Sequence, residues 1–149
     1  MTSLSKPVEA ARTGHPIYSQ TFPCEPETAG RGRKLVRVAL GAWHLDDLTD
    51  PAELIISELV ANAARHTPCR SLRLIVGRPG TARVRIGVVD RAPSRLPVLS
   101  PADTVGESGR GLLLIDALAD RWGYTLLGSH PKRGPWGKET WAELKAAAL

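Results

Sequence analysis

Two polar side chains in an apolar stretch have a spacing that could support chemistry on a shared ligand. Glu58 and Asn62 lie four residues apart in Ser-Glu-Leu-Val-Ala-Asn-Ala-Ala. On a helix they would lie one turn apart on the same face. A carboxylate can take up a proton, and an amide oxygen can bind a hard cation. A surface pair that contacts only water has the same spacing, so spacing alone leaves both interpretations open.

A third candidate is a carboxylate at the end of a predicted strand. Asp90 follows Val84–Val89, and its two-residue period places it on the same face as Val84, Ile86 and Val88. We therefore expect Asp90 to point inward, where it could accept a hydrogen bond from a ligand's amine. An aspartate that forms a turn is the alternative, because aspartate is common at the ends of strands.

A glycine-containing segment ends a long loop, residues 91–109, and opens a helix. Gly109-Arg110-Gly111-Leu112 would let the backbone approach a ligand closely, and the free amides of a helix N-terminus attract phosphate. Arg110 adds a planar cation. This pattern is weak evidence by itself, because many loops contain it and the Gly-Lys-Ser/Thr of a P-loop is absent.

Periodicity predicts the elements that must position these residues. Apolar residues at helical or alternating spacing indicate a series of helices and strands. The order is strand 17–22, helix 25–43, helix 50–66, hairpin 72–76 with 84–88, helix 112–118, strand 122–127 and strand 139–144.

Composition is that of one globular domain. The chain has 149 residues, of which 42% are hydrophobic and 23% charged. Residues 1–15 lack periodicity and are predicted to form a flexible arm before a domain over residues 16–149. No apolar run is long enough to span a membrane and no secretory signal is visible, so we expect a cytoplasmic protein. Cys24 and Cys69 are expected to be free thiols.

The net charge of +5 is compatible with nucleic acid, nucleotide or an acidic protein as partner. Arg73, Arg83 and Arg85 would all point away from the core, and such a face could contact DNA. Nucleic-acid binding is nevertheless disfavoured, because the basic residues form no block and few aromatic residues are present to stack on bases.

In order, these motifs resemble those of the histidine-kinase-like ATPase (Bergerat-fold) superfamily, especially the small anti-sigma-factor serine/threonine kinases of actinobacteria. Ser57–His66 is similar to the N box and Val88–Pro93 to the first glycine box. Gly109–Leu112 is similar to the second glycine box, and Gly137–Trp141 to the strand that follows it. The resemblance covers roughly residues 17–145.

The resemblance implies an α/β two-layer sandwich with a mixed, mostly antiparallel sheet of about five strands and three helices on one face. It also implies binding of ATP and Mg²⁺. Glu58 would activate the attacking hydroxyl, Asn62 would coordinate Mg²⁺ and Asp90 would accept from the adenine amine. The remaining nucleotide-binding positions implied are Ala92, Gly109, Arg110, Gly111, Leu112 and Thr140.

The family resemblance further implies a sigma factor and an anti-sigma antagonist as partners, with phosphorylation of the antagonist. A homodimer formed through the sheet side would use Tyr18, Phe22 and the first strand. The first glycine box departs from the family's Asp-x-Gly-x-Gly, because Ala92 and Ser94 replace both glycines. We therefore expect weakened nucleotide binding. The alternative is a protein-binding module on the same fold without phosphoryl transfer.

Overall fold

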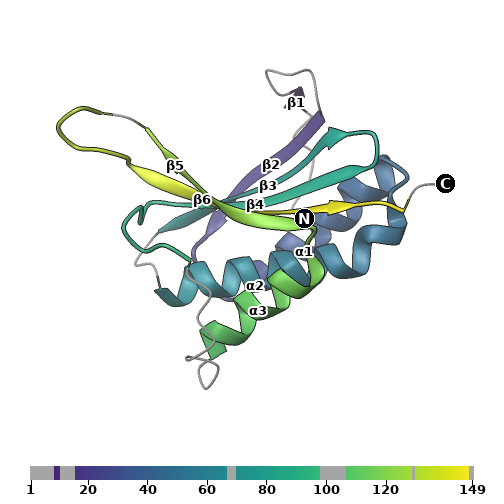
Figure 1. The fold of residues 1–149 in the computed structure, drawn as a ribbon, viewed down its shortest axis with the longest axis horizontal. Coiled ribbons are helices and arrows are strands. Elements are labelled where there is room, and N and C mark those ends of the chain that lie inside the picture. The colour runs from purple at the N-terminus through teal and green to yellow at the C-terminus, as the bar shows by residue number, and fades with distance from the viewer. Residues whose placement is uncertain (1–8, 11–15, 67–69, 98–106, 129, 148–149) are drawn as a thin grey trace.

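The computed structural model describes residues 9–10, 16–66, 70–97, 107–128 and 130–147. The side chains of 9–10, 66 and 107–110 are also outside the description. Three helices cover one face of a single sheet (Figure 1). This arrangement confirms the predicted two-layer α/β fold.

The helical layer follows the predicted periodicity. It consists of α1 (Thr28–Ala42), the short 3₁₀ helix η1 (Asp46–Leu48), α2 (Thr49–His66) and α3 (Glu107–Leu118). Among the described contacts, α2 packs against α1, α3 and β4. The central position of α2 matters because this helix carries both Glu58 and Asn62.

The sheet has the strand order β1-β2-β3-β4-β6-β5. Its strands are β1 (Glu9–Ala10), β2 (Pro16–Pro23), β3 (Ser71–Gly80), β4 (Arg83–Asp90), β5 (Arg121–Leu127) and β6 (Gly137–Lys145). Every neighbouring pair is antiparallel, so the parallel component implied by a mixed sheet is absent from the described residues. The order brings β6 beside β4, and thus Lys138 opposite Asp90.

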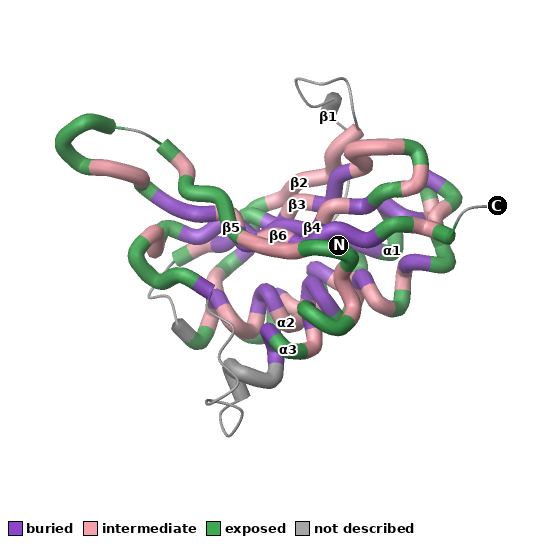
Figure 2. The backbone as a smooth tube through the Cα atoms, viewed as in Figure 1, coloured by how far each residue is buried: buried purple, intermediate pink, exposed green. Residues whose placement is uncertain are grey.

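The hydrophobic core lies between the helices and the sheet, where Figure 2 colours many residues of both layers as buried. Alternate residues of β4 and β6 point into it, including Val84, Ile86, Val88, Ala142 and Leu144. Burying a valine, isoleucine or leucine side chain contributes about 1.5–3 kcal/mol. The same alternation places Asp90 and Thr140 on the buried face, as predicted, with exposed fractions of 3% and 6%.

Phe22 and Tyr18, the residues suggested for a homodimer, pack within the chain, while the homodimer itself stays a prediction. Phe22 is buried in the core, and the Tyr18 ring lies 5.6 Å from the Trp43 ring. Both positions have the parity of the helix-facing side of β2, which explains why they pack inside the chain. The expectation of free thiols is wrong for Cys24, which is disulfide-bonded. The chain's other cysteine, Cys69, lies outside the described residues.

The face of the sheet opposite the helices carries a compensated charge cluster. Arg85 lies 3.1 Å from Glu139 and 3.4 Å from Glu143, and its guanidinium stacks 4.3 Å from the Trp141 ring. Arg121 lies 2.7 Å from Glu143. Because carboxylates neutralise these cations, the outward-facing Arg85 gives no support to a DNA-binding face.

Burial raises the pKa of Glu143, but hydrogen bonds and charge from Arg121 and Arg85 outweigh this effect and hold it below its ordinary value. A carboxyl group whose pKa is lower in the folded state stabilises the fold above its unfolded pKa. That contribution disappears as the pH falls through the folded pKa.

We predict that Glu143→Gln lowers the thermal midpoint by several degrees at pH 7 and by less at about pH 3, because below the ordinary pKa of a glutamate the unfolded state takes up a proton that the folded state resists, and the contribution of the carboxylate is progressively lost. Glu53→Gln is the control, because Glu53 pairs with the mostly exposed Arg37, and exposed pairs contribute little. Thermal unfolding between pH 3 and pH 8 tests this. A midpoint difference that does not change with pH would contradict it.

Two glycines of α1 allow the packing of α1 on α2 to be tested with a matched control. A Cβ atom at Gly32 would lie 2.9 Å from Ile56 Cγ1, whereas one at Gly30 would meet only the flexible end of Arg33 at 3.4 Å. We predict that Gly32→Ala destabilises the protein by about 1–3 kcal/mol through overpacking. Gly30→Ala should be neutral or stabilising, by up to about 1 kcal/mol, because alanine favours helix. Denaturant unfolding of both variants measures the contrast, and equal effects would contradict it.

Candidate functional site

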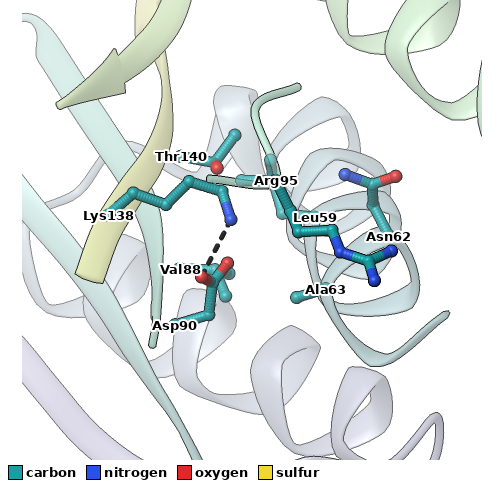
Figure 3. A pocket seen from close by; sticks show the side chains of 8 residues that line it. All are labelled: Leu59, Asn62, Ala63, Val88, Asp90, Arg95, Lys138 and Thr140. Carbon is teal, nitrogen blue, oxygen red and sulfur yellow. Dashed lines mark hydrogen bonds and ion pairs between the residues drawn. The ribbon is translucent and has the colours of Figure 1, made fainter. Parts of the chain in front are cut away.

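Asp90 ends β4 inside the protein and is paired with a cation. Its Oδ1 atom lies 2.9 Å from Nζ of Lys138, the residue directly opposite on β6. Both side chains are almost fully buried, with exposed fractions of 3% and 4%. Figure 3 shows the two groups pointing toward each other. A buried carboxylate requires such a partner, because an isolated buried charge is very costly.

The same two groups fix the chain that follows β4. The Ala92 N–H donates to Asp90 Oδ1 at 2.8 Å, and Lys138 Nζ donates to the Ala92 carbonyl at 2.7 Å. The Arg95 N–H donates to that same carbonyl at 3.1 Å. The turn-forming interpretation of Asp90 is therefore correct in part, since the side chain both faces inward and caps the turn after the strand.

A small cavity adjoins the ion pair. Its lining comes from α2, β4, β6 and the segment after β4: Leu59, Asn62, Ala63, Val88, Asp90, Arg95, Lys138 and Thr140 (Figure 3). The cavity volume is about 20 Å³, which is on the scale of one water molecule. The structure thus brings together the predicted positions Asn62, Asp90 and Thr140.

Glu58 lies one turn earlier on α2 and faces the start of α3. A Cβ atom at Gly111 would lie 2.8 Å from Glu58 Oε2, so the absence of a side chain there makes room for the carboxylate. Glu58 and Asn62 share a helix face as predicted. Glu58, however, does not line the cavity that contains Asn62.

The second glycine box lies within α3 and not before it. Because α3 begins at Glu107, Gly109 and Arg110 fall in its first turn, where backbone N–H groups lack helical partners. Residues 98–106 of the predicted loop lie outside the described residues, as do the side chains of 107–110. Leu112 is buried in the hydrophobic core.

Gly137 permits the close approach of β6 to the end of β4. A Cβ atom there would lie 2.5 Å from the Asp90 carbonyl oxygen, a contact that real side chains essentially never make. The missing side chain lets the next residue, Lys138, lie beside Asp90. The Gly137–Trp141 motif therefore has a packing reason in this chain, independent of any ligand.

The residues around the cavity fit ATP and Mg²⁺ in chemistry but not, in this conformation, in space. Asp90 offers an acceptor for an amine, and its Oδ2 atom makes none of the hydrogen bonds described above. Asn62 offers an amide oxygen, which suits Mg²⁺. Ligand pockets usually enclose about 300–1,000 Å³, so a base could enter only if side chains such as Lys138 or Arg95 moved.

Sequence reasoning missed Lys138 and Arg95 as lining residues. Lys138 could have been found, because it lies two residues from Thr140 and therefore shares its buried face. Arg95 lies in a segment without periodicity, and no sequence signal pointed to it. The described residues contain no cluster of three or more His, Cys, Asp or Glu side chains suited to a metal ion. None of the described helices is long and apolar enough to cross a membrane.

Comparison with known proteins shows similarity in the region that carries this site. Residues 22–133 match the model of the histidine kinase-like ATPase domain, a family that implies ATP binding and, typically, Mg²⁺. An uncharacterized protein of Streptomyces coelicolor is 46% identical over 56 residues. That alignment covers 32% of this chain, and the chain spans about half, 53%, of the relative's length.

The matched range includes Glu58, Asn62, Asp90 and Gly111, while Lys138 and Thr140 follow it. It spans more than half of the chain and contains the elements α2, β4 and α3, which converge on the site. These findings support an ATP-binding domain of the ATPase type. The chain therefore belongs to the histidine kinase-like ATPase family.

Proposed function

We propose that the protein is an ATP-dependent regulator of the anti-sigma type, which binds a sigma factor and phosphorylates a serine of an anti-sigma antagonist. The observation that carries the proposal is the convergence of three motifs. Glu58 of α2 lies against Gly111 of α3, and Asn62, one turn away, shares a cavity with Asp90 and Thr140.

The site has a base end at Asp90 and Thr140 and a phosphate end at the start of α3, and these suit the base and the phosphates of a nucleotide. The Asp90 carboxylate and the Thr140 hydroxyl are hydrogen-bonding groups suited to a base, and both are anchored on rigid strands. The first turn of α3 has backbone N–H groups that suit phosphate oxygens. Asn62 lines the cavity beside Asp90, one turn after Glu58 on α2, and its amide oxygen suits an ion that bridges phosphates.

Glu58 is the group placed to handle a proton. Its carboxylate lies beside Gly111 of α3, so a serine hydroxyl brought there could give its proton to Glu58 as its oxygen attacks phosphorus. Bound ATP with Mg²⁺ would supply the phosphoryl group and neutralise its charge. The protein's contribution would then be positioning and electrostatic stabilisation, as in other phosphoryl transfers.

A second candidate function is a protein-binding module that transfers no phosphoryl group. The specific observation in its favour is the closed base end, because Asp90 is already paired with Lys138 and the cavity holds about 20 Å³. Ala92 and Ser94, where the family has glycines, agree with it. Nucleotide binding and transfer must therefore be measured separately.

We predict that Glu58→Ala and Asn62→Ala separate the two steps. Glu58→Ala should keep ATP affinity within about two-fold but reduce phosphoryl transfer by about 10²-fold or more, because it removes only the proton acceptor. Asn62→Ala should weaken Mg²⁺-dependent ATP binding about ten-fold, the effect of losing one ligand to a charged group. Glu53→Ala is the control, since Glu53 lies on the same helix but pairs with Arg37 of α1.

Calorimetry with ATP, with and without Mg²⁺, measures binding. Transfer of the γ-phosphoryl group to purified anti-sigma antagonists measures the second step. Absence of ATP binding by the wild-type protein at millimolar concentration would contradict the nucleotide assignment. Binding without transfer to any antagonist would overturn the kinase proposal and favour the protein-binding module.

A further inference from the structure

Lys138 holds the carboxylate that the base of a nucleotide would need. Its ammonium group has three N–H donors, of which one reaches Asp90 Oδ1 and one reaches the Ala92 carbonyl. The side chain is only 4% exposed and lines the same cavity as Asn62 and Thr140 (Figure 3). We propose that Lys138 sets the affinity and the base selectivity of this site, because its ammonium group competes with the amine of adenine for Asp90.

This proposal rests on the proposed ATP binding and concerns how the base is selected. Without a nucleotide, Asp90 receives two hydrogen bonds at Oδ1, one from Lys138 and one from the Ala92 N–H. The Coulombic attraction of the ammonium group makes its bond the stronger of the two. An adenine amine is neutral, so it enters as a weaker donor to a carboxylate that already has a cation.

The size of the cavity also indicates that Lys138 opposes binding of a base. A cavity of about 20 Å³ next to Asp90 does not accommodate a purine. The long side chain of Lys138 occupies the buried face between Asp90 and Thr140, and its ammonium group is held at both ends of the turn 90–92. Entry of a base therefore requires Lys138 to move, and this movement breaks two charge-assisted hydrogen bonds.

The same competition determines which base is preferred. ATP and ITP differ at purine position 6, where ATP has an amine and ITP has an oxygen. The amine can donate to Asp90, but Lys138 at Oδ1 already compensates the charge of the carboxylate and occupies the space beside it. The oxygen cannot donate to Asp90, but it can accept the remaining N–H of Lys138. With Lys138 present, the site should discriminate weakly between the two nucleotides.

The test is the ratio of ATP to ITP affinity in Lys138→Met, measured by calorimetry with Mg²⁺. Methionine keeps the length of the side chain but has no donor, so Asp90 would lack a cation and gain most from the adenine amine. We expect ATP affinity to rise about ten-fold or more. ITP affinity should stay constant or fall, so that the ratio rises at least ten-fold.

The change in the ATP-to-ITP affinity ratio distinguishes competition for Asp90 from a general loss of positive charge. ATP and ITP carry the same phosphates, so loss of a cation by itself would weaken both equally and leave the ratio unchanged. Lys34→Met is the matched control, because Lys34 is exposed on α1 and does not line the cavity. It should leave the ratio unchanged.

Lys138→Gln covers the case in which Lys138→Met does not fold, since removing one partner of a buried ion pair is strongly destabilising. Its neutral amide can still donate to Asp90, and the ratio should rise by a smaller factor. An unchanged or lowered ratio in the folded variant, with ATP bound by the wild type, overturns the role of Lys138 alone. Failure of the wild type and the variants to bind either nucleotide overturns the proposed function as well.

Discussion

The ion pair between Asp90 and Lys138 is the interaction on which the site depends. It joins the last residue of β4 to β6, and through the Ala92 carbonyl it also fixes the start of the following segment. Gly137 makes the approach of the two strands possible, because any side chain there would meet the Asp90 carbonyl. Because the pair is buried, each charge depends on the other, since either charge alone would be very costly to bury.

The site has two parts with different degrees of closure. At the base end, Lys138 satisfies Asp90 and leaves room for about one water molecule. At the other end, Gly111 of α3 gives the Glu58 carboxylate room. Asn62, one turn after Glu58 on α2, lines the cavity at Asp90. The family match implies ATP binding, while the closed base end explains physically why we expect that binding to be weak.

Periodicity predicted the parts of the fold that obey a regular pattern. The alternation of β4 placed Asp90 on the buried face, the spacing of Glu58 and Asn62 placed both on one side of α2, and both predictions are confirmed. The start of α3 was predicted too late. Glycines at 109 and 111 suggested a loop, whereas in the structure both lie within the helix.

What the sequence did not predict depended on pairings between distant segments. Lys138 has the parity of a buried residue, but a lysine is seldom buried unless a partner is present, and nothing in the sequence linked it to Asp90. The strand order β4-β6 supplies that link. The expectation of a free thiol at Cys24 failed for a similar reason, because local periodicity does not show which other sulfur a cysteine will meet.

A crystal structure with Mg²⁺ and a non-hydrolysable ATP analogue tests the central claim most directly. We expect the adenine amine to lie within hydrogen-bond distance of Asp90, the phosphates to lie near Asn62 and the α3 N-terminus, and Lys138 Nζ to have moved away from Asp90 Oδ1. A nucleotide bound elsewhere on the protein, or a base at Asp90 with the 2.9 Å ion pair intact, would contradict the account.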